Sequence, residues 1–569
     1  MDTVRPYDAS PCYPPVGGGV RTGWDAAGES LPAGTWVLAV DGPAFASWDE
    51  LVKGLMRTME GLGRPVRTLS TAAWLAPWQR VVELTSSPGL AADPDFEKLA
   101  PGDLADLFTV PSRLDPPDGG VLIVFGPGAA LAPHDILWYA DLPKRYAEAA
   151  VGSGAGINLG MRQADGTATS KRLFFVDWPL LDRHRDRIAG RVDLWLDMQD
   201  PLAPAALDGA TMRATVAGLA GRPFRTRPTF NTTPWGGHWG QTQLGHNPEA
   251  PNTALGYELI APEAGVLVGD RGGPLVELPF QLVVAGHPAA VLGDPVHRTF
   301  GTSFPIRFDY LDTFRGGNLS VHCHPAPGYM RTVFGWPYTQ HESYYVMIGG
   351  DGNRVFLGLA GDADLDSFER AALAADRAGT PFDISRYVQE FPASEHQLFL
   401  VPAGTPHGSG AGNVVLEVSA TPYLYSLRFY DWLRRDANGG RRPVHVERAF
   451  ANLDRDRSGP AVARDLVQRP RVLRQGDGWR EELIGALPEM FFDVRRLVLA
   501  QGATADDDAS AGFHVLNVVD GGGVIVEPAD GPSHVLAYAE TIVVPAAVGR
   551  YTLRAAGNRP VKVVKALVR

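Results

Sequence analysis

The sequence predicts a multidomain protein, with an N-terminal α/β domain followed by two β-barrels. Its 569 residues are more than one hydrophobic core organises. Apolar runs alternate with helical patterns in the first part of the chain, which is typical of an α/β domain with a largely parallel sheet. From residue 228 onward, short apolar runs alternate with turn residues. The 65 glycines and 47 prolines favour such a loop-rich β architecture.

The α/β domain is expected over residues 35–225, after an irregular lead-in of residues 1–34. The run TWVLAVDGP (35–43) predicts a buried strand, and SWDELVKGLMRTMEGLG (47–63) predicts an amphipathic helix with Ser47 as its N-cap. Three further strands are predicted: one in GGVLIVFGPGAAL (119–131), one at the start of DILWYADLPKRYAEAAV (135–151) and one in KRLFFVDWP (171–179).

The two barrels are expected over residues 226–450 and 484–569. The first carries a helical insertion at about 362–379, where DADLDSFERAALAADRAG has a helical pattern. A connector rich in arginine and aspartate, residues 451–483, joins the two barrels. The short strands and the turn residues between them are the pattern of sandwiches and barrels.

Composition excludes several classes of function. The formal net charge of -12 argues against a general nucleic-acid binder, which needs a basic surface. Two cysteines make no disulfide framework, and no stretch of 18 apolar residues occurs. We therefore expect a soluble cytoplasmic protein with no nucleic-acid or membrane partner. The sequence predicts no oligomeric state.

A metal site is predicted in the first barrel. In NLSVHCHPAPGYM (318–330), His322 and His324 share one strand face, because alternate residues of a strand point the same way. Glu342 stands just before an apolar strand, and His407 lies in a turn rich in proline and glycine. Two histidines, a glutamate and a distant histidine form the ligand order of a cupin metal site. Imidazole with carboxylate suits Zn²⁺, Fe²⁺ or Mn²⁺. The alternative for the two histidines is a polar, solvated strand face.

The second half of the chain resembles the class I (type I) mannose-6-phosphate isomerases, members of the cupin (jelly-roll) superfamily. Four segments in order carry the resemblance: PTFNTTPWGGHWGQTQLG (228–245), FPIRFDYLDTFRGGNLSVHCHP (304–325), QHESYYVM (340–347) and VPAGTPHGSGAGNVVLEVSATPYLYSLRFYDW (401–432). The resemblance implies an aldose–ketose isomerase that interconverts mannose 6-phosphate and fructose 6-phosphate through an enediolate, with one Zn²⁺ per chain. Fe²⁺ and Mn²⁺ are the other candidate metals.

The same resemblance assigns the site residues. The implied zinc ligands are His322, His324, Glu342 and His407, with His322 standing where the family has glutamine. The implied catalytic residues are Glu417 and Arg428, and the implied substrate-binding residues are Ser320, Arg307 and Gln340. From the residues alone, Glu417 is alternatively a buried carboxylate paired with an arginine, and Arg428 alternatively pairs with Asp431.

Two departures leave the substrate open. His322 stands where the family has glutamine and Gln340 where it has lysine, so at Gln340 a positive charge expected near a phosphate is missing; Arg307 likewise stands in place of a lysine. The alternatives are an isomerase of another sugar or sugar phosphate, a metal-binding cupin that senses a sugar without converting it, and an Fe²⁺ oxygenase. A small-molecule sugar phosphate is the expected partner.

The flanking domains carry weaker signals. The C-terminal region resembles the second, cupin-like barrel of the same family, with Val548 where the first barrel has His407, so no metal ligands are expected there. VLAVDGP and VLIVFGPG faintly resemble strands of P-loop kinases, but no G-x-x-x-x-G-K-[ST] loop follows them. The N-terminal domain is therefore interpreted as a degenerate kinase-like domain used for assembly or ligand sensing.

Overall fold

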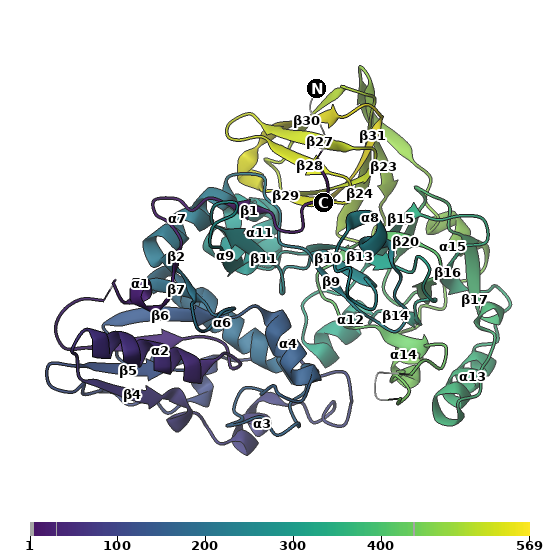
Figure 1. Ribbon diagram of the computed structural model, residues 1–569. Coiled ribbons are helices and arrows are strands. Elements are labelled where there is room, and N and C mark those ends of the chain that lie inside the picture. The colour runs from purple at the N-terminus through teal and green to yellow at the C-terminus, as the bar shows by residue number, and fades with distance from the viewer. Residues whose placement is uncertain (1–4, 30, 436–438) are drawn as a thin grey trace. The chain divides into compact units, whose positions relative to one another are not determined.

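The computed structural model describes residues 5–29, 31–435 and 439–569, which form two compact units (Figure 1). The α/β unit consists of residues 12–219 and 265–286. The β unit consists of the described residues up to Pro11 together with residues 220–264 and 287–569. Among the described helices, none is both long enough and apolar enough to cross a membrane.

The α/β unit is built on a seven-stranded sheet in the order β2-β8-β7-β6-β3-β5-β4. Its five parallel strands are β3 (Trp36–Asp41), β4 (Val66–Ser70), β5 (Val121–Phe125), β6 (Ile136–Asp141) and β7 (Leu194–Asp197). Two antiparallel strands, β8 (Ala205–Asp208) and β2 (Arg21–Thr22), complete one edge. Every residue of β3 is buried, because parallel strands have both faces covered. The expected largely parallel sheet is confirmed.

Helices cover this sheet. They are α1 (Trp24–Gly28), α2 (Trp48–Gly61), α3 (Trp78–Thr85), α4 (Lys144–Gly152), α5 (Ser170–Arg172), α6 (Trp178–Ile188) and α7 (Gly209–Ala220). Helix α2 buries Leu51, Leu55 and Met59 in one core with the strand residues Leu38 and Val40. Ser47 holds the predicted N-cap position of α2, but its side chain makes no capping hydrogen bond.

The strand predicted at 171–179 is wrong. Residues 170–188 form a continuous helical segment, in which five residues, Leu173–Asp177, adopt a π-helical turn between α5 and α6. The hydroxyl of Thr169 caps its start by accepting from the N–H of Arg172. The apolar run buries Leu173, Phe175 and Val176, and burial of a short run does not distinguish a strand from a helix. The neighbouring strand is β7 instead.

The unit boundaries differ from those expected. A small sheet of β1 (Cys12–Tyr13), β11 (Gly265–Val268) and β12 (Val276–Pro279), with α9 (Phe280–Gly286), belongs to the α/β unit rather than to the first barrel. Polar contacts of Glu277 on β12 explain why this sheet belongs to the α/β unit. The N–H of Glu277 donates to Asp197 at 2.8 Å, and Arg145 donates to both carboxylate oxygens of Glu277. The expected irregular lead-in likewise contains β1, β2 and α1.

The β unit begins with a pair of antiparallel sheets, here called the first sandwich. The six-stranded sheet has the order β18-β15-β20-β13-β10-β9, and the five-stranded sheet has the order β17-β16-β19-β14-β21. The strands are β9 (Thr229–Asn231), β10 (Leu255–Leu259), β13 (Ile306–Asp312), β14 (Val321–Cys323), β15 (Glu342–Ile348), β16 (Arg354–Leu359), β17 (Val388–Pro392), β18 (Leu398–Val401), β19 (His407–Ser409), β20 (Val414–Ala420) and β21 (Leu427–Tyr430). Side chains of β19 and β15 meet between the sheets, so the two sheets face each other.

Short helices accompany the first sandwich: α8 (Trp239–Leu244), α10 (Pro288–Leu292), α11 (Asp294–Phe300), α12 (Pro327–Tyr329), α14 (Val446–Asn452) and α15 (Pro460–Asp465). The predicted helical insertion is confirmed as α13 (Leu365–Ala378). It begins at Asp364, whose carboxylate accepts from the N–H groups of Asp366 and Ser367, and it ends at Gly379 in the left-handed region.

The second sandwich follows at the C-terminal end of the β unit. One sheet contains β22 (Arg471–Gly476), β23 (Trp479–Gly485), β24 (Phe492–Leu499), β31 (Val561–Val568), β26 (His514–Asp520) and β29 (Thr541–Val544). The other contains β25 (Thr504–Asp508), β30 (Arg550–Ala556), β27 (Gly523–Pro528) and β28 (His534–Ala537). Residues of both sheets share one core, against which Val548 packs. This sandwich starts before residue 484, because the exposed, arginine-rich β22 pairs with β23.

Candidate metal centre and pocket

Three histidines converge between the sheets of the first sandwich. His322 lies on β14, His407 begins the adjacent β19, and the two are register partners. His324 follows β14 immediately. All three side chains are buried, and one ring nitrogen of each lies within 4.8 Å of those of the other two. Within the described parts of the chain, this is the one group of histidine, cysteine and acidic side chains with such spacing.

Main-chain carbonyls fix the orientation of all three rings. The Nδ1 atom of His322 donates to the carbonyl of Ser320 at 2.9 Å, that of His407 to Thr405 at 2.9 Å, and that of His324 to Tyr425 at 3.2 Å. A carbonyl oxygen only accepts, so each Nδ1 carries the proton and each Nε2 presents a lone pair. This is the arrangement of a metal-binding histidine whose second nitrogen is held in place.

Glu342, the first residue of β15, brings a carboxylate to the same point from the facing sheet. Its Oε1 lies 2.9 Å from Nε2 of His324, and its Oε2 lies 3.1 Å from Nε2 of His407. Burial alone raises the pKa of Glu342, but His324 and His407 hold it well below its ordinary value. The side chain is therefore an ionised carboxylate.

The donor set fits a metal cation. Nε2 lone pairs facing carboxylate oxygens at hydrogen-bond distance repel one another unless a proton or a cation lies between them. Burial lowers the pKa of His324, although the charge of Glu342 opposes this shift. Burial also lowers the pKa of His322 well below its ordinary value, and the neighbouring His407 and His324 lower it further. Protonated rings are thus disfavoured. Three nitrogens and one carboxylate suit a divalent transition-metal ion.

Arg307 of β13 anchors the carboxylates next to the metal centre. Its Nη2 donates to Glu417 on β20 and, at 3.2 Å, to Oε1 of Glu342, while its Nε donates to the hydroxyl of Ser419 at 2.6 Å. The hydroxyl of Ser419 in turn donates to Glu417 at 2.9 Å. A single guanidinium therefore faces several buried carboxylates.

Because one guanidinium faces several carboxylates, the ionised form of Glu417 is disfavoured. Burial raises the pKa of Glu417 well above its ordinary value, and the neighbouring charges of Asp309 and Glu342 add to the rise against the opposing effect of Arg307. A carboxyl with a raised pKa is suited to taking and returning a proton near neutral pH.

Asp309 is a member of the site that the sequence analysis did not identify. It stands two residues after Arg307 on β13 and therefore shares the inner face of the sheet. It is the register partner of Glu417 on one side and of Tyr257 on the other. The signal was present, since a charged residue at i+2 from a site residue on a strand points the same way.

A pocket with a volume of about 220 Å³ connects these groups. It is lined by Arg307, Ser320, His322, Gln340, Glu342, Glu417 and Arg428 of the predicted site residues. Asp309, Tyr257, Thr233, Trp235, Tyr344 and Arg442 line it as well. His324 and His407 do not line the pocket, and their Nε2 atoms face the carboxylate of Glu342.

The remaining predicted residues have defined neighbours. The hydroxyl of Ser320 lies 3.3 Å from Nδ1 of His322. Gln340 donates its amide to Glu342, while its Oε1 is buried without a hydrogen bond. Arg428 donates to the carbonyl of Pro443 at 2.8 Å, and the carboxylate of Asp431 contacts Arg434 and Arg442. The structure thus brings the predicted residues together, while their roles stay predictions.

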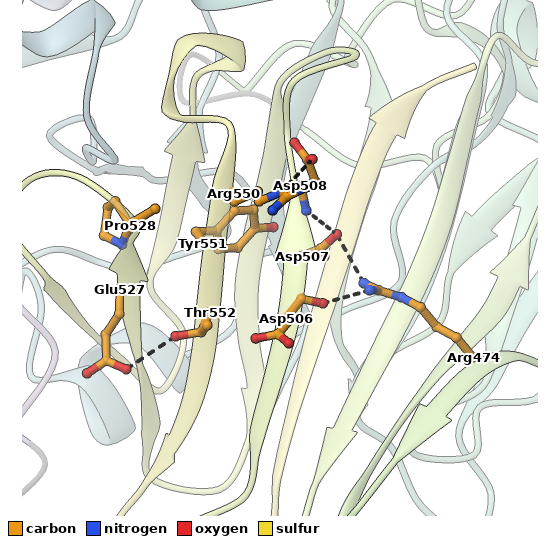
Figure 2. A pocket seen from close by; sticks show the side chains of 10 residues that line it. Arg474, Asp506, Asp507, Asp508, Glu527, Pro528, Arg550, Tyr551 and Thr552 are labelled. Atoms are coloured by element: carbon orange, nitrogen blue, oxygen red, sulfur yellow. Dashed lines mark hydrogen bonds and ion pairs between the residues drawn. The ribbon is translucent and has the colours of Figure 1, made fainter.

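Another cavity, of about 690 Å³, lies on the second sandwich (Figure 2). Several of its polar side chains contact one another. Arg474 donates to Asp507, with Nη2 and Oδ1 3.0 Å apart, and the hydroxyl of Thr552 donates to Glu527 at 3.3 Å, as Figure 2 shows. No group of histidine, cysteine and acidic side chains with the spacing of a metal site is found in this lining among the described residues.

Comparison with known proteins gives partial matches. The sequence model of a family described as a domain of unknown function (DUF8485) matches residues 23–221, less than half of the chain. A mannose-6-phosphate isomerase from Streptococcus mutans is 27% identical over 218 residues, which cover 38% of this chain and 63% of that protein. The chain thus spans less than two thirds of the length of that curated relative.

Comparison with solved structures likewise gives matches that cover only part of this chain. The mannose 6-phosphate isomerase from Bacillus subtilis gives a TM-score of 0.49 at 17% identity, covering 61% of this chain and all of that one (100%). A phosphomannose isomerase variant from Salmonella typhimurium gives a TM-score of 0.48 at 13% identity, also covering 61% of this chain and 100% of that one.

Proposed function

We propose that this protein is a metal-dependent aldose–ketose isomerase and that the pocket of the first sandwich binds the open-chain sugar. The observation that carries the proposal is the convergence of three Nε2 lone pairs and the Glu342 carboxylate beside the buried pair Arg307 and Glu417. Such a site combines metal ligands with a carboxyl suited to proton transfer, which aldose–ketose isomerisation requires.

His322, His324, Glu342 and His407 are the proposed ligands of one Zn²⁺, with Fe²⁺ and Mn²⁺ as the alternatives. When bound, the metal polarises the carbonyl and hydroxyl oxygens at C1 and C2 of the sugar as a Lewis acid. The main-chain hydrogen bonds on Nδ1 hold the rings ready for the ion, so little reorganisation is needed on binding.

Glu417 is the proposed base that moves the proton between C1 and C2. It lines the pocket, and its raised pKa lets it accept a proton from carbon and return it to the adjacent carbon. Arg307 and Ser419 hold the carboxylate in place. Arg428 lines the same pocket, where a guanidinium can bind a phosphate or steady developing negative charge.

Mannose 6-phosphate and fructose 6-phosphate are the proposed substrate pair. The support is the ordered set of sequence motifs together with the partial match to the Streptococcus mutans enzyme. Gln340 lines the pocket where the resemblance leads one to expect a lysine, so an isomerase of another sugar or sugar phosphate is the second candidate. The α/β unit is proposed to serve assembly or ligand sensing.

The test is a coupled assay for fructose 6-phosphate formed from mannose 6-phosphate, with zinc-loaded and with chelated protein. Zinc-dependent turnover that is absent from His324→Ala supports both the metal centre and the isomerase. Turnover that survives complete metal removal contradicts the proposal. Protein that retains one metal ion but converts none of a panel of aldoses and aldose phosphates would instead be a sugar sensor.

A further inference from the structure

The carboxylate of Asp309 is buried in the pocket wall with unused hydrogen-bonding capacity. Its side chain is 2% exposed, and its Oδ1 has no hydrogen-bond partner in the described part of the protein. Nε of Arg307 lies 3.9 Å from Oδ1, and this nitrogen already donates to Ser419. Native proteins rarely leave a buried carboxylate oxygen without a partner, because its desolvation is then uncompensated.

The surroundings of Asp309 show what can reach it. Across the six-stranded sheet, the register aligns Tyr257, Asp309, Glu417 and Tyr344 in one row on the inner face. The residue two positions further along β13 is Leu311, also in the pocket wall, so the polar row borders an apolar one. All four members of the row line the pocket. A hydrogen-bond donor for Oδ1 of Asp309 can therefore reach it from a ligand in the pocket.

We infer that Asp309 is a substrate-binding residue whose Oδ1 accepts a hydrogen bond from a hydroxyl group of a polyhydroxylated, open-chain ligand. The inference rests on the proposed function, since it names the chemistry of the substrate in that site. A carboxylate accepts hydrogen bonds from hydroxyl donors, and a charge-assisted bond of this kind is stronger than a neutral one. Asp309 therefore selects for a free hydroxyl group at its position in the row, between Tyr257 and Glu417.

The same charge excludes a phosphate group from the neighbourhood of Asp309. Two anions in a buried site repel each other, and the guanidinium of Arg307 is already shared with Glu417 and Glu342. Arg428 and Arg442 line the pocket from β21 and the segment after it, which belong to the other side of the sandwich. A sugar phosphate thus places its phosphate toward these arginines and its hydroxyls toward Asp309.

The test measures binding rather than turnover. Mannitol is the probe, because it presents the hydroxyls of an open-chain hexose and has no carbonyl to isomerise. Its dissociation constant is measured by calorimetry on the zinc-loaded full chain, on Asp309→Asn and on Asp309→Leu. Asp351→Asn, which changes an exposed carboxylate in the turn before β16, is the matched control.

We expect mannitol to bind about ten- to hundredfold more weakly to Asp309→Leu, with a smaller loss for Asp309→Asn and none for Asp351→Asn. The monodeoxy mannitol that lacks the hydroxyl donating to Asp309 has no such bond to lose, so it should bind wild type and Asp309→Leu equally. A general distortion of the pocket would instead weaken its binding to the variant as well. Equal mannitol affinities in all four proteins, with zinc content unchanged, overturn the inference, and so does a wild type that binds no mannitol. Mannitol binding that depends on Asp309 without any sugar turnover overturns the isomerase but leaves Asp309 as a hydroxyl-binding residue.

Discussion

Arg307 and Glu417 form a buried ion pair between the neighbouring strands β13 and β20. The pair holds the proposed base one row of the sheet away from Glu342, which is the register partner of Ser419 on β20. Glu342 and the proposed base therefore stand on the same sheet, and their separation is set by strand pairing rather than by loops, whereas the three histidines come from the facing sheet.

Replacing Glu417 with glutamine tests the base directly. The amide keeps the shape of the side chain and its contacts with Arg307 and Ser419 but takes up no proton. We expect turnover to fall by about 10²- to 10⁴-fold, as for loss of a general base, with zinc content and melting temperature nearly unchanged. Full turnover in a zinc-loaded Glu417→Gln protein would assign the base to another group.

Replacing His407 with alanine tests the metal site. Outer-shell changes lower metal affinity by about 10- to 100-fold, so loss of a direct ligand should exceed that range. Metal content measured by atomic spectroscopy should fall in His407→Ala and stay normal in His396→Ala. The latter histidine contacts Tyr345 and Asp520 and lies outside the cluster. Equal metal content in both variants would place the metal elsewhere.

Chelation should also lower the thermal stability. An ion that binds only the folded state stabilises it by about 2.7 kcal/mol when present at about a hundred times its Kd. We expect the melting temperature of wild type to rise with added Zn²⁺ and that of His407→Ala to be insensitive to it. A wild-type melting temperature that does not change with zinc would contradict specific binding to the folded protein.

The carboxyl of Asp309 makes stability depend on pH. Burial raises its pKa from 3.8 to about 6, against the lowering effect of Arg307. Between these two pKa values the folded protein binds more protons than the unfolded chain, so stability is lost as the pH rises through this window. The shift corresponds to roughly 3 kcal/mol at pH 7.5 and roughly 1 kcal/mol at pH 4.5.

Asp309→Asn removes this penalty, because its amide does not ionise. In urea unfolding of metal-free protein, we expect the variant to exceed wild type in the free energy of unfolding by more at pH 7.5 than at pH 4.5. A difference between the two proteins that is independent of pH would show that Asp309 does not titrate in this range.

The interior of the second sandwich contains a charge network that should be essential for stability. Lys565 is 1% exposed and contacts Glu481 at 2.6 Å and Asp507 at 2.5 Å. Removing one partner of a buried pair leaves uncompensated charge, so Lys565→Met should lower the free energy of unfolding by about 3–5 kcal/mol. Lys562→Met on the same strand breaks a partly exposed pair with Asp520 and should change it by less than about 1 kcal/mol. Similar losses in chemical denaturation would contradict this account.

The turn after β3 in the α/β unit leaves no room for a side chain. A Cβ at Gly42 would lie 2.3 Å from the carbonyl oxygen of Ala140, whereas a Cβ at Gly61, the last residue of α2, meets nothing within 4 Å. We expect Gly42→Ala to destabilise the protein and Gly61→Ala to stabilise it by about 0.5–1 kcal/mol through its helix propensity. If the melting temperatures of both variants shifted in the same direction, the packing described for Gly42 would be contradicted.

Sequence reasoning grouped the candidate site residues better than it placed the domain boundaries. Alternation on a strand placed His322 and His324 on one face, and the ordered motifs brought Glu342 and His407 to them across the barrel. Asp309 was missed although strand alternation places it on the same face as Arg307, because its significance depends on its pairing with Glu417 on the neighbouring strand. The helix at 170–188 was misread because tertiary burial decides the state of a short aromatic run.

The boundaries failed for a related reason. β22 carries almost no apolar signal, since it is an exposed edge, and Glu277 joins the α/β unit through polar contacts with Asp197 and Arg145. Neither edge pairing nor long-range polar contact leaves a periodic trace in the sequence.

The carbonyls that orient the histidine rings belong to the main chain, and this has a consequence for mutational tolerance. A support made of side chains is lost with a single substitution, whereas the carbonyls of Ser320, Thr405 and Tyr425 persist whatever side chain those positions carry. Substitutions at these three positions leave the ring orientation unchanged as long as the local backbone conformation is preserved. Only changes that move the backbone, such as insertions in the turn before His407, can turn a ring away from its neighbours.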